Sequence, residues 1–309
     1  MEVTALLVAS TLRIAVPYVF AAVGGFYSER SGVVNIALEG MLLTGGFACV
    51  LAAWGAESAG VNGTAAAWLG VVAAAAAGTA LGALHALLCV RYGADQIISG
   101  LGINLLAAGG TKFLLTLAFG SSANSSRIAG IPTWEIPWLS DWSVTRVLFC
   151  TPLVLLAGAV VVVSHLVSRR TPFGLRLHAV GEHPEAAHSL GIRVARLRWK
   201  GVMLSGALAA LGGAWLALEQ HQFTAGMSSG RGFIALAALI FGKWTPRGAA
   251  LACLLFGFAE AVQIQLQGSR IGVPSQFLQM LPYVVTMIAL AGVIGRSRPP
   301  AALGRALEP

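Results

Sequence analysis

Apolar residues occupy the chain in long runs, and polar residues collect in the short turns between them. Several runs reach the roughly 20 residues that an α-helix needs to cross the hydrocarbon core of a bilayer. The pattern predicts about nine membrane-spanning helices. One run, 231–244, is short enough to be a half-helix, so the range is eight to ten. The nine segments lie near 3–26, 33–54, 64–90, 97–119, 146–168, 200–219, 231–244, 247–267 and 276–295.

Composition points to the same class of protein. Of the 309 residues, 57% are hydrophobic and only 10% are charged, whereas soluble domains carry about 25% charged residues. A soluble chain with so few charges could not cover its own surface. We therefore expect an all-α polytopic membrane protein that forms a single transmembrane domain over residues 1–309.

Basic residues give the orientation, because Lys and Arg of short loops face the cytoplasm. The connection 169–200 is rich in Arg, and the C-terminal tail is also basic, so both should lie inside the cell. The loop 120–145 carries three Trp residues and few charges, which suits the outer membrane interface. Nine spans then place the N-terminus outside. The net charge of +8 is explained by these inner loops, and no nucleic-acid partner is expected.

Two stretches near the start of the chain have counterparts near its end. The segment 31–47 resembles 229–244, and 81–107 has the same texture as 256–287. The copies begin five spans apart, and an odd offset reverses the direction across the membrane. The pattern predicts an inverted repeat with halves at about 27–119 and 225–295, an arrangement common in transporters. Chance similarity of Gly-, Ala- and Leu-rich helices is the alternative.

The basic connection contains the sequence 183-HPEAAHSLG-191. Pro184 suits the first helical turn, Glu185 complements the positive end of the helix dipole, and Gly191 suits the position just past the end. The pattern predicts a cytoplasmic helix of about two turns. So short a helix is marginal alone and needs a partner surface, either its own membrane domain or another protein.

The spacing of Glu-Ala-Ala, three residues and Gly resembles the EAA loop of ABC-importer permeases. The fuller stretch 179-AVGEHPEAAHSLGIRVARLRWKGVMLSGALAALGGA-214 is similar to the branch that carries ribose-type sugars, branched-chain amino acids and nucleosides. Within that branch the chain most resembles permeases of bacterial nucleoside importers, over about residues 16–295. The segments 31-SGVVNIALEGMLLTGGF-47, 94-ADQIISGLGINLLA-107 and 230-GRGFIALAALIFGKWTPRGA-249 also carry the resemblance.

The resemblance implies that the short helix is a coupling helix seated on a cytoplasmic ATPase, with Glu185, Ala186, Ala187 and Gly191 at the contact. It also implies a second homologous permease, in a heterodimer, an extracellular substrate-binding lipoprotein, and a place among the lipids of the bacterial cell membrane. The sequence lacks G-x-x-x-x-G-K-[ST], so ATP and Mg²⁺ would be bound by the ATPase. No cofactor, catalytic residue or metal site is expected in this chain.

Polar residues within the apolar segments are candidates for the translocation path, since such residues are costly in a membrane and often functional. Their amide and carboxyl groups could bind the hydroxyls and base edges of a nucleoside. The alternative is that they join helices or neutralise one another, for example Glu39 with Arg13 or Lys112. The candidates are Asn35, Glu39, Gln96, Asn104 and Glu260.

These observations favour the permease subunit of an ATP-driven importer, with nucleosides as the expected substrate. Ribose-like sugars and branched-chain amino acids are alternatives within the same branch. A secondary transporter driven by an ion gradient is a different class, which would also use an inverted repeat but has no need of an EAA-like helix. An enzyme is not expected, because no catalytic constellation is present.

Overall fold

The computed structural model describes residues 2–134, 143–268 and 298–305, together with positions 277, 280 and 284. Within these residues the secondary structure is helical, apart from an isolated bridge between Asn124 and Thr224. The predicted segment 276–295 lies almost wholly outside the described residues. The described part of the chain is therefore all-helical and consists of many apolar helices, as the composition predicted.

Each of the first eight predicted segments coincides with a helix. Among the residues that the structure describes, seven helices are long and apolar enough to cross a membrane, and α10 is shorter, as expected of the seventh segment. The helices are α1 (Glu2–Arg30), α2 (Leu38–Ser58), α3 (Gly63–Ala86) with a π-helical turn η1 (Leu87–Arg91), α4 (Gln96–Phe119), α5 (Ser143–Cys150), α6 (Pro152–Arg170), α7 (Pro172–Glu182), α8 (Pro184–Ser189), α9 (Val194–Gln220), α10 (Arg231–Phe241) and α11 (Pro246–Gly268).

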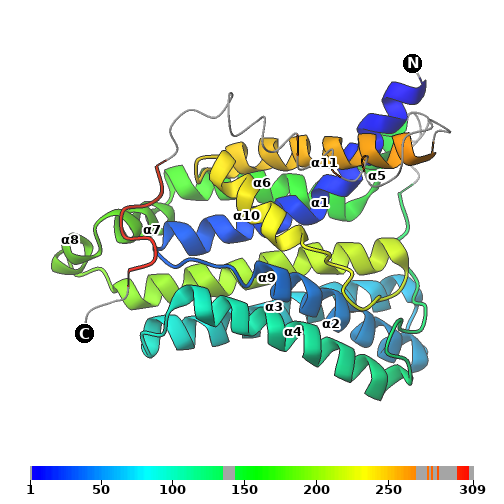
Figure 1. Ribbon diagram of the computed structural model, residues 1–309, viewed down its shortest axis with the longest axis horizontal. Helices are drawn as coiled ribbons and strands as arrows, with labels where there is room; N and C mark the ends of the chain where they lie inside the picture. The colour runs from blue at the N-terminus through cyan, green and yellow to red at the C-terminus, as the bar shows by residue number, and fades with distance from the viewer. Residues whose placement is uncertain are drawn as a thin grey trace.

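The long helix α9 occupies the centre of the bundle, packed against α1, α2 and α3 (Figure 1). Glycine permits this close packing, since helices in lipid associate through small residues that let backbones approach. A Cβ atom on Gly213 of α9 would overlap the carbonyl oxygen of Leu42 in α2, and Gly78 of α3 meets Gly206 of α9 backbone to backbone.

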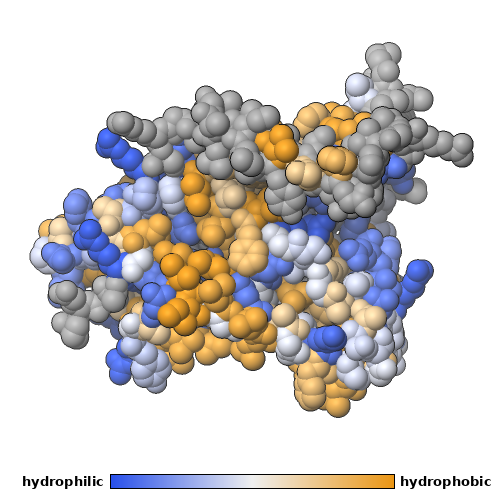
Figure 2. Space-filling view, in the orientation of Figure 1, coloured by the Kyte–Doolittle hydropathy of each residue, from blue (hydrophilic) through white to orange (hydrophobic). Residues whose placement is uncertain are grey.

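Apolar side chains cover much of the middle of the face in Figure 2, and hydrophilic residues gather toward its two ends. Helix α4 contributes strongly to the exposed apolar surface, since Ile98, Leu105 and Leu117 are each more than 70% exposed. Such a surface suits contact with lipid tails rather than water. The four cysteines, in contrast, are all free and buried.

The loops separate into two groups at opposite ends of the bundle. At one end Arg30, α7 and the tail 298–305 are joined by hydrogen bonds. At the other end the loop 120–134 contacts the chain after α9, as shown by the bond from the Ser125 N–H to the Phe223 carbonyl. The basic connection and the tail thus share one end of the molecule, and the loop predicted to lie outside starts from the other.

Two segments interrupt the helical path inside the bundle. After α1 ends at Arg30, residues 31–37 form turns and irregular backbone before α2 begins, although the pattern predicted a helix from residue 33. A second irregular segment, 221–230, separates α9 from α10. We call these segments the first break and the second break. Each contains a glycine at positive φ: Gly32 lies just after the end of α1, and Gly230 lies just before the start of α10.

Candidate translocation and coupling site

The first break is held by polar side chains from neighbouring helices. Gln96, at the start of α4, accepts a hydrogen bond of 2.7 Å from the backbone N–H of Val34. His85 of α3 lies 3.0 Å from the Val34 carbonyl through Nε2 and 2.9 Å from the Ser99 hydroxyl through Nδ1. Because a carbonyl only accepts, Nε2 carries the proton. These bonds replace those that a continuous helix would supply.

Two asparagines complete this support. Asn35 is fully buried, and its side chain donates to the Ser205 hydroxyl of α9 at 2.8 Å while accepting from the Ala37 N–H. Asn104 of α4 donates to the Ile36 carbonyl at 3.0 Å and accepts from the Gly40 N–H at 2.7 Å. Three of the predicted path residues therefore meet on one irregular segment, and their polar groups are engaged by the protein itself.

Glu39 connects the two breaks. It lies in the first turn of α2, and its two carboxylate oxygens accept from the backbone N–H groups of Gly230 and Gly232, at 2.8 and 2.7 Å. A carboxylate is stabilised there by the positive end of the α10 dipole. The sequence suggested Arg13 or Lys112 as a partner, but Arg13 pairs with Glu219 at 3.3 Å.

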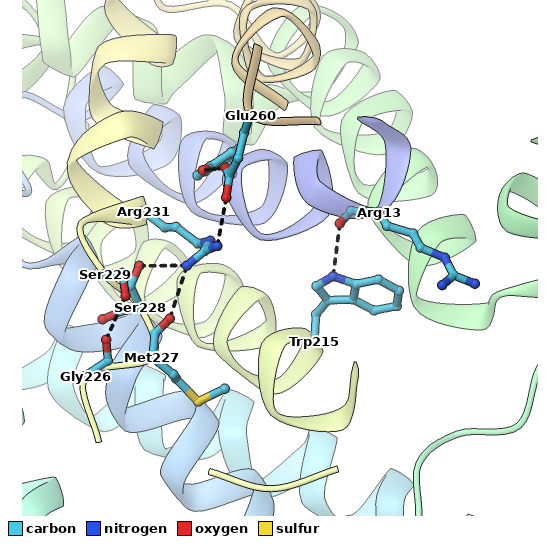
Figure 3. Close-up of polar contacts among 9 residues, drawn as sticks. Arg13, Trp215, Gly226, Met227, Ser228, Ser229, Arg231 and Glu260 are labelled. Carbon is cyan, nitrogen blue, oxygen red and sulfur yellow. Dashed lines mark hydrogen bonds and ion pairs between the residues drawn. The ribbon is translucent and has the colours of Figure 1, made fainter. Parts of the chain in front are cut away.

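Glu260, the fifth path candidate, approaches α10 from α11. It receives a hydrogen bond from the Tyr18 hydroxyl of α1 and forms a 3.0 Å ion pair with Arg231. Arg231 also donates to the Met227 carbonyl at 3.2 Å, so it ties the second break to α11 (Figure 3). Arg231 was not singled out from the sequence, although its place beside Gly230 in the repeated Ser-Gly motif was a usable signal.

A pocket of about 390 Å³ opens beside this ion pair, between α1, α9, α10 and α11. Arg13, Trp215, Glu219 and Arg231 line it together with apolar residues. The Trp215 indole is fixed by a 3.1 Å bond to the Arg13 carbonyl (Figure 3). The volume of the pocket lies in the range of small-molecule sites, which combine mostly apolar walls with a few polar groups.

The helix predicted over 183–191 is present as α8. Glu185 and Ala186 face solvent, and Gly191 follows the helix with φ +78°. Ala187 instead is buried against Val180 and Val194. The short helix is therefore anchored on its own domain through Ala187. Glu185 and Ala186 lie on its outward side, and Leu190, directly after the helix, is 81% exposed.

A separate helix, α7, precedes α8 and was not predicted. It begins at Pro172, and the Thr171 hydroxyl accepts from the Gly174 N–H at 3.2 Å, which is a typical helix start. On α7, burial and the nearby Arg30 guanidinium lower the pKa of His178 below its ordinary value. The neutral ring lies 2.8 Å from the Ser168 hydroxyl and joins α7 to α6.

Comparison with known proteins gives concordant results. The guanosine ABC transporter permease NupQ of Bacillus subtilis (strain 168) is 41% identical, over 98% of this chain and 96% of the relative. The nucleoside ABC transporter permease NupC of Lactococcus lactis subsp. cremoris (strain MG1363) is 40% identical, over 97% and 95%. A second guanosine ABC transporter permease of B. subtilis, NupP, is 25% identical over 94% of this chain and 84% of the relative.

Among solved structures, a metal-chelate type ABC transporter in an inward-facing conformation shares the fold. It aligns with a TM-score of 0.50 at 14% identity and covers 92% of this chain and 84% of that chain. The sequence model of the permease component of branched-chain amino acid transport systems matches residues 7–290. The chain therefore belongs to this family of transport-system permeases and is a multi-pass membrane protein.

Proposed function

We propose that this chain is the transmembrane permease subunit of an ATP-driven nucleoside importer in the bacterial cell membrane. The observation that carries the proposal is the sequence identity of 40–41%, over nearly the whole chain, with two permeases that are named for guanosine and for nucleosides. Ribose-like sugars and branched-chain amino acids are the alternative substrates within the family.

Coupling to ATP is assigned to α8 and to Gly191, which lies two residues beyond the end of that helix. Glu185 and Ala186 are exposed, and Gly191 leaves the surface beyond the helix open, since no atom lies within 4 Å of the place of its missing Cβ. A separate ATPase subunit with bound ATP and Mg²⁺ would seat on this surface. Small side chains there allow close contact, and Ala187 holds the helix to the permease.

Nine spans related by an inverted repeat are proposed for the membrane domain. Supporting this, the similar sequences 31-SGVVNIALEG-40 and 229-SGRGFIALAA-238 each run from a break into the helix that follows it. The helices that follow them, α2 and α10, meet end to end through Glu39. Discontinuous helices that meet near the substrate path are typical of transporters built from inverted repeats.

The five path candidates are assigned two roles. Asn35, Glu39, Gln96 and Asn104 support the breaks, because each binds backbone groups there. Glu260 contributes with Arg231 to the polar lining of the path, since Arg231 faces the pocket of about 390 Å³. Substrate would pass beside the breaks, whose rearrangement opens the path to either side.

The assembly is proposed to contain a second, related permease, two ATPase domains and an extracellular substrate-binding lipoprotein. B. subtilis provides a precedent for paired permeases, since NupQ and NupP both carry the name of a guanosine permease and both resemble this chain. A heterodimer would place two coupling helices on two ATPase domains.

Reconstitution of the complex in lipid vesicles tests the function. We expect uptake of labelled guanosine that requires ATP and the binding protein, with little uptake of ribose or leucine. Uptake that an ionophore abolishes while ATP remains high would instead indicate an ion-coupled carrier. Tight binding of a sugar or a branched-chain amino acid by the cognate binding protein would reassign the substrate.

The coupling surface is tested with bulky substitutions. Glu185→Trp and Gly191→Trp should leave insertion intact and uncouple ATP hydrolysis from uptake. Val162→Trp, on a side chain of α6 that is 57% exposed, is the matched control and should transport normally. Normal uptake by both α8 variants would contradict the coupling role.

A further inference from the structure

The tail segment 298–305 lies across the end of the bundle that carries α7 and α8 (Figure 1). It contacts α7 through two backbone N–H groups. That of Ala302 donates to the Gly181 carbonyl at 2.8 Å, and that of Ala301 donates to the Glu182 carboxylate at 3.2 Å. The Ala302 side chain is 1% exposed, whereas the Ala301 side chain is exposed. One face of the tail is therefore packed into the protein.

The same segment also contacts the first break. The Gly304 N–H donates to the Gly32 carbonyl at 3.2 Å, and the Arg305 carbonyl accepts from the Arg198 guanidinium at 2.8 Å. Gly32 has φ +92°, and a Cβ added there would lie 3.1 Å from Arg198 Nη2. The tail, the first break and the start of α9 are thus packed together.

Arg198 is an unusual residue for this position, because its side chain is only 1% exposed. Its Nε and Nη2 groups have no hydrogen-bond partner among the residues that the structure describes. A buried charge that is poorly paired costs free energy, so simple packing would be served better by an apolar side chain. The hydrogen bond to the Arg305 carbonyl indicates that this arginine holds the tail in place.

Helix α7 and the first break meet at Arg30 as well. The Arg30 guanidinium forms a 3.2 Å ion pair with Glu182, and the Arg30 carbonyl lies against Gly181. From Arg30 the chain runs directly into the first break, whose Val34 and Ile36 bind α3 and α4. A continuous series of contacts therefore joins α7 to the polar side chains of α3 and α4 that bind the first break.

We propose that the tail 298–305 is a tie that transmits movement of α7 and α8 to the first break, with Arg198 as its positioning residue. This inference rests on the proposed coupling function. The tail binds α7 at one end and the first break at the other, so displacement of α7 by an ATPase pulls on both. Arg198 fixes the far end of the tie to α9, the most buried helix.

Two neighbouring alanines supply a matched test in the reconstituted complex. Ala302→Gln forces a polar side chain into the contact with α7, whereas Ala301→Gln adds the same side chain in solvent. We expect Ala302→Gln to lower guanosine uptake per ATP hydrolysed by about fivefold, the lower range of measured coupling between sites, while Ala301→Gln matches the wild type. Equal ratios for the two variants would overturn the tie.

Arg198→Met separates the tie from mere stability. Methionine replaces the aliphatic part of the arginine side chain and lacks the poorly paired buried charge, so the variant should accumulate at least as well as the wild type. Arg198→Met should nevertheless lower uptake per ATP hydrolysed, as Ala302→Gln does. If Ala302→Gln fails to accumulate, Arg198→Met alone tests whether the tail transmits movement. An unchanged ratio in Arg198→Met would refute the tie.

The double variant adds a further requirement. A tie cut at one end is already without effect, so Ala302→Gln with Arg198→Met should uncouple no more than either change alone. Multiplied losses would instead show two independent contacts and reject the tie. If the wild-type complex shows no ATP-driven uptake, the proposed function itself is refuted. If the wild type couples ATP hydrolysis to uptake and the variants do so equally well, only the tie is refuted.

Discussion

The carboxylate of Glu39, in the first turn of α2, lies 2.7 Å from the backbone nitrogen of Gly232, in the first turn of α10. The two helices are almost 200 residues apart in sequence, and each follows a break. Gly232 must lack a side chain, because a Cβ would overlap the backbone of Glu39. One charged group therefore both joins the two breaks and completes the hydrogen bonding of α10.

Removal of this carboxylate should destabilise the bundle. Glu39→Ala leaves the N–H groups of Gly230 and Gly232 without this acceptor, which costs about 1–3 kcal/mol for the buried Gly232 group and less for the partly buried Gly230 group. Glu39→Gln keeps one acceptor and should cost less. The thermal unfolding temperature in detergent measures both effects. Glu219→Gln, on a side chain 43% exposed in its ion pair, is the control and should change little; an equal loss there would argue against the capping role.

Close helix contacts make some glycines irreplaceable. Gly213→Ala should push α9 away from Leu42 of α2 and cost about 1–3 kcal/mol, as overpacking commonly does. Gly109→Ala, on α4 with nothing within 4 Å of the added atom, is the matched control and should be neutral. Comparison of folded yield and unfolding temperature checks this, and similar behaviour of the two variants would contradict the packing argument.

Adjacent alanines of α8 should give opposite phenotypes. Ala186→Glu changes only an exposed surface, so the protein should fold normally and lose ATP-coupled uptake. Ala187→Glu places a carboxylate into the small cluster with Val180 and Val194 and should reduce stability by a few kcal/mol. Membrane abundance together with uptake per ATP distinguishes them. The assignment of faces fails if Ala187→Glu accumulates normally while Ala186→Glu does not.

The pair of Arg231 and Glu260 should behave as a unit. Each side chain is about one fifth exposed, so loss of one partner leaves the other charge poorly solvated and destabilises the protein. The double variant Arg231→Gln with Glu260→Gln should recover part of the loss. A double-mutant cycle on thermal unfolding measures the coupling, which would vanish if the two groups acted independently.

His178 should make the α6–α7 contact sensitive to acid. Burial and the positive charges of Arg30 and Arg169 lower its pKa below the ordinary 6.5, against an opposing effect of Glu182. Below pH 6.5 the histidine of the unfolded chain is protonated, whereas the histidine of the folded protein stays neutral to lower pH. The free energy of unfolding therefore decreases as the pH is lowered, until the pKa of the folded state is passed. The loss in unfolding temperature between about pH 7.5 and 5.5 should shrink in His178→Gln; an identical loss would exclude His178 as the cause.

The class of fold was predictable because a membrane imposes it. Long apolar runs with few charges can satisfy their backbone groups in lipid only as helices, and eight of the nine predicted segments fall on helices. The first break was not predicted, since residues 33–37 are as apolar as the helix that follows. What unwinds them is polar support from Gln96, Asn104 and His85, which are distant in sequence.

The sequence suggested candidate residues for the translocation path but not the groups that they contact. Asn35, Glu39 and Glu260 were proposed as candidates because polar residues within spans are often functional, but the sequence could not show what they bind. Backbone N–H groups, the partners of Glu39, leave no trace in a pattern of side chains. Arg231 was not among the candidates, although it stands at the first position of the predicted segment 231–244.

The burial of all four cysteines has a practical consequence. Thiol reagents that stay in water would find no native target among Cys49, Cys89, Cys150 and Cys253, so the natural chain serves as its own unreactive background. Single cysteines introduced at Ala186 or at Ala301 would report, through membrane-impermeant maleimides, on which side of the bilayer the short helix and the tail emerge.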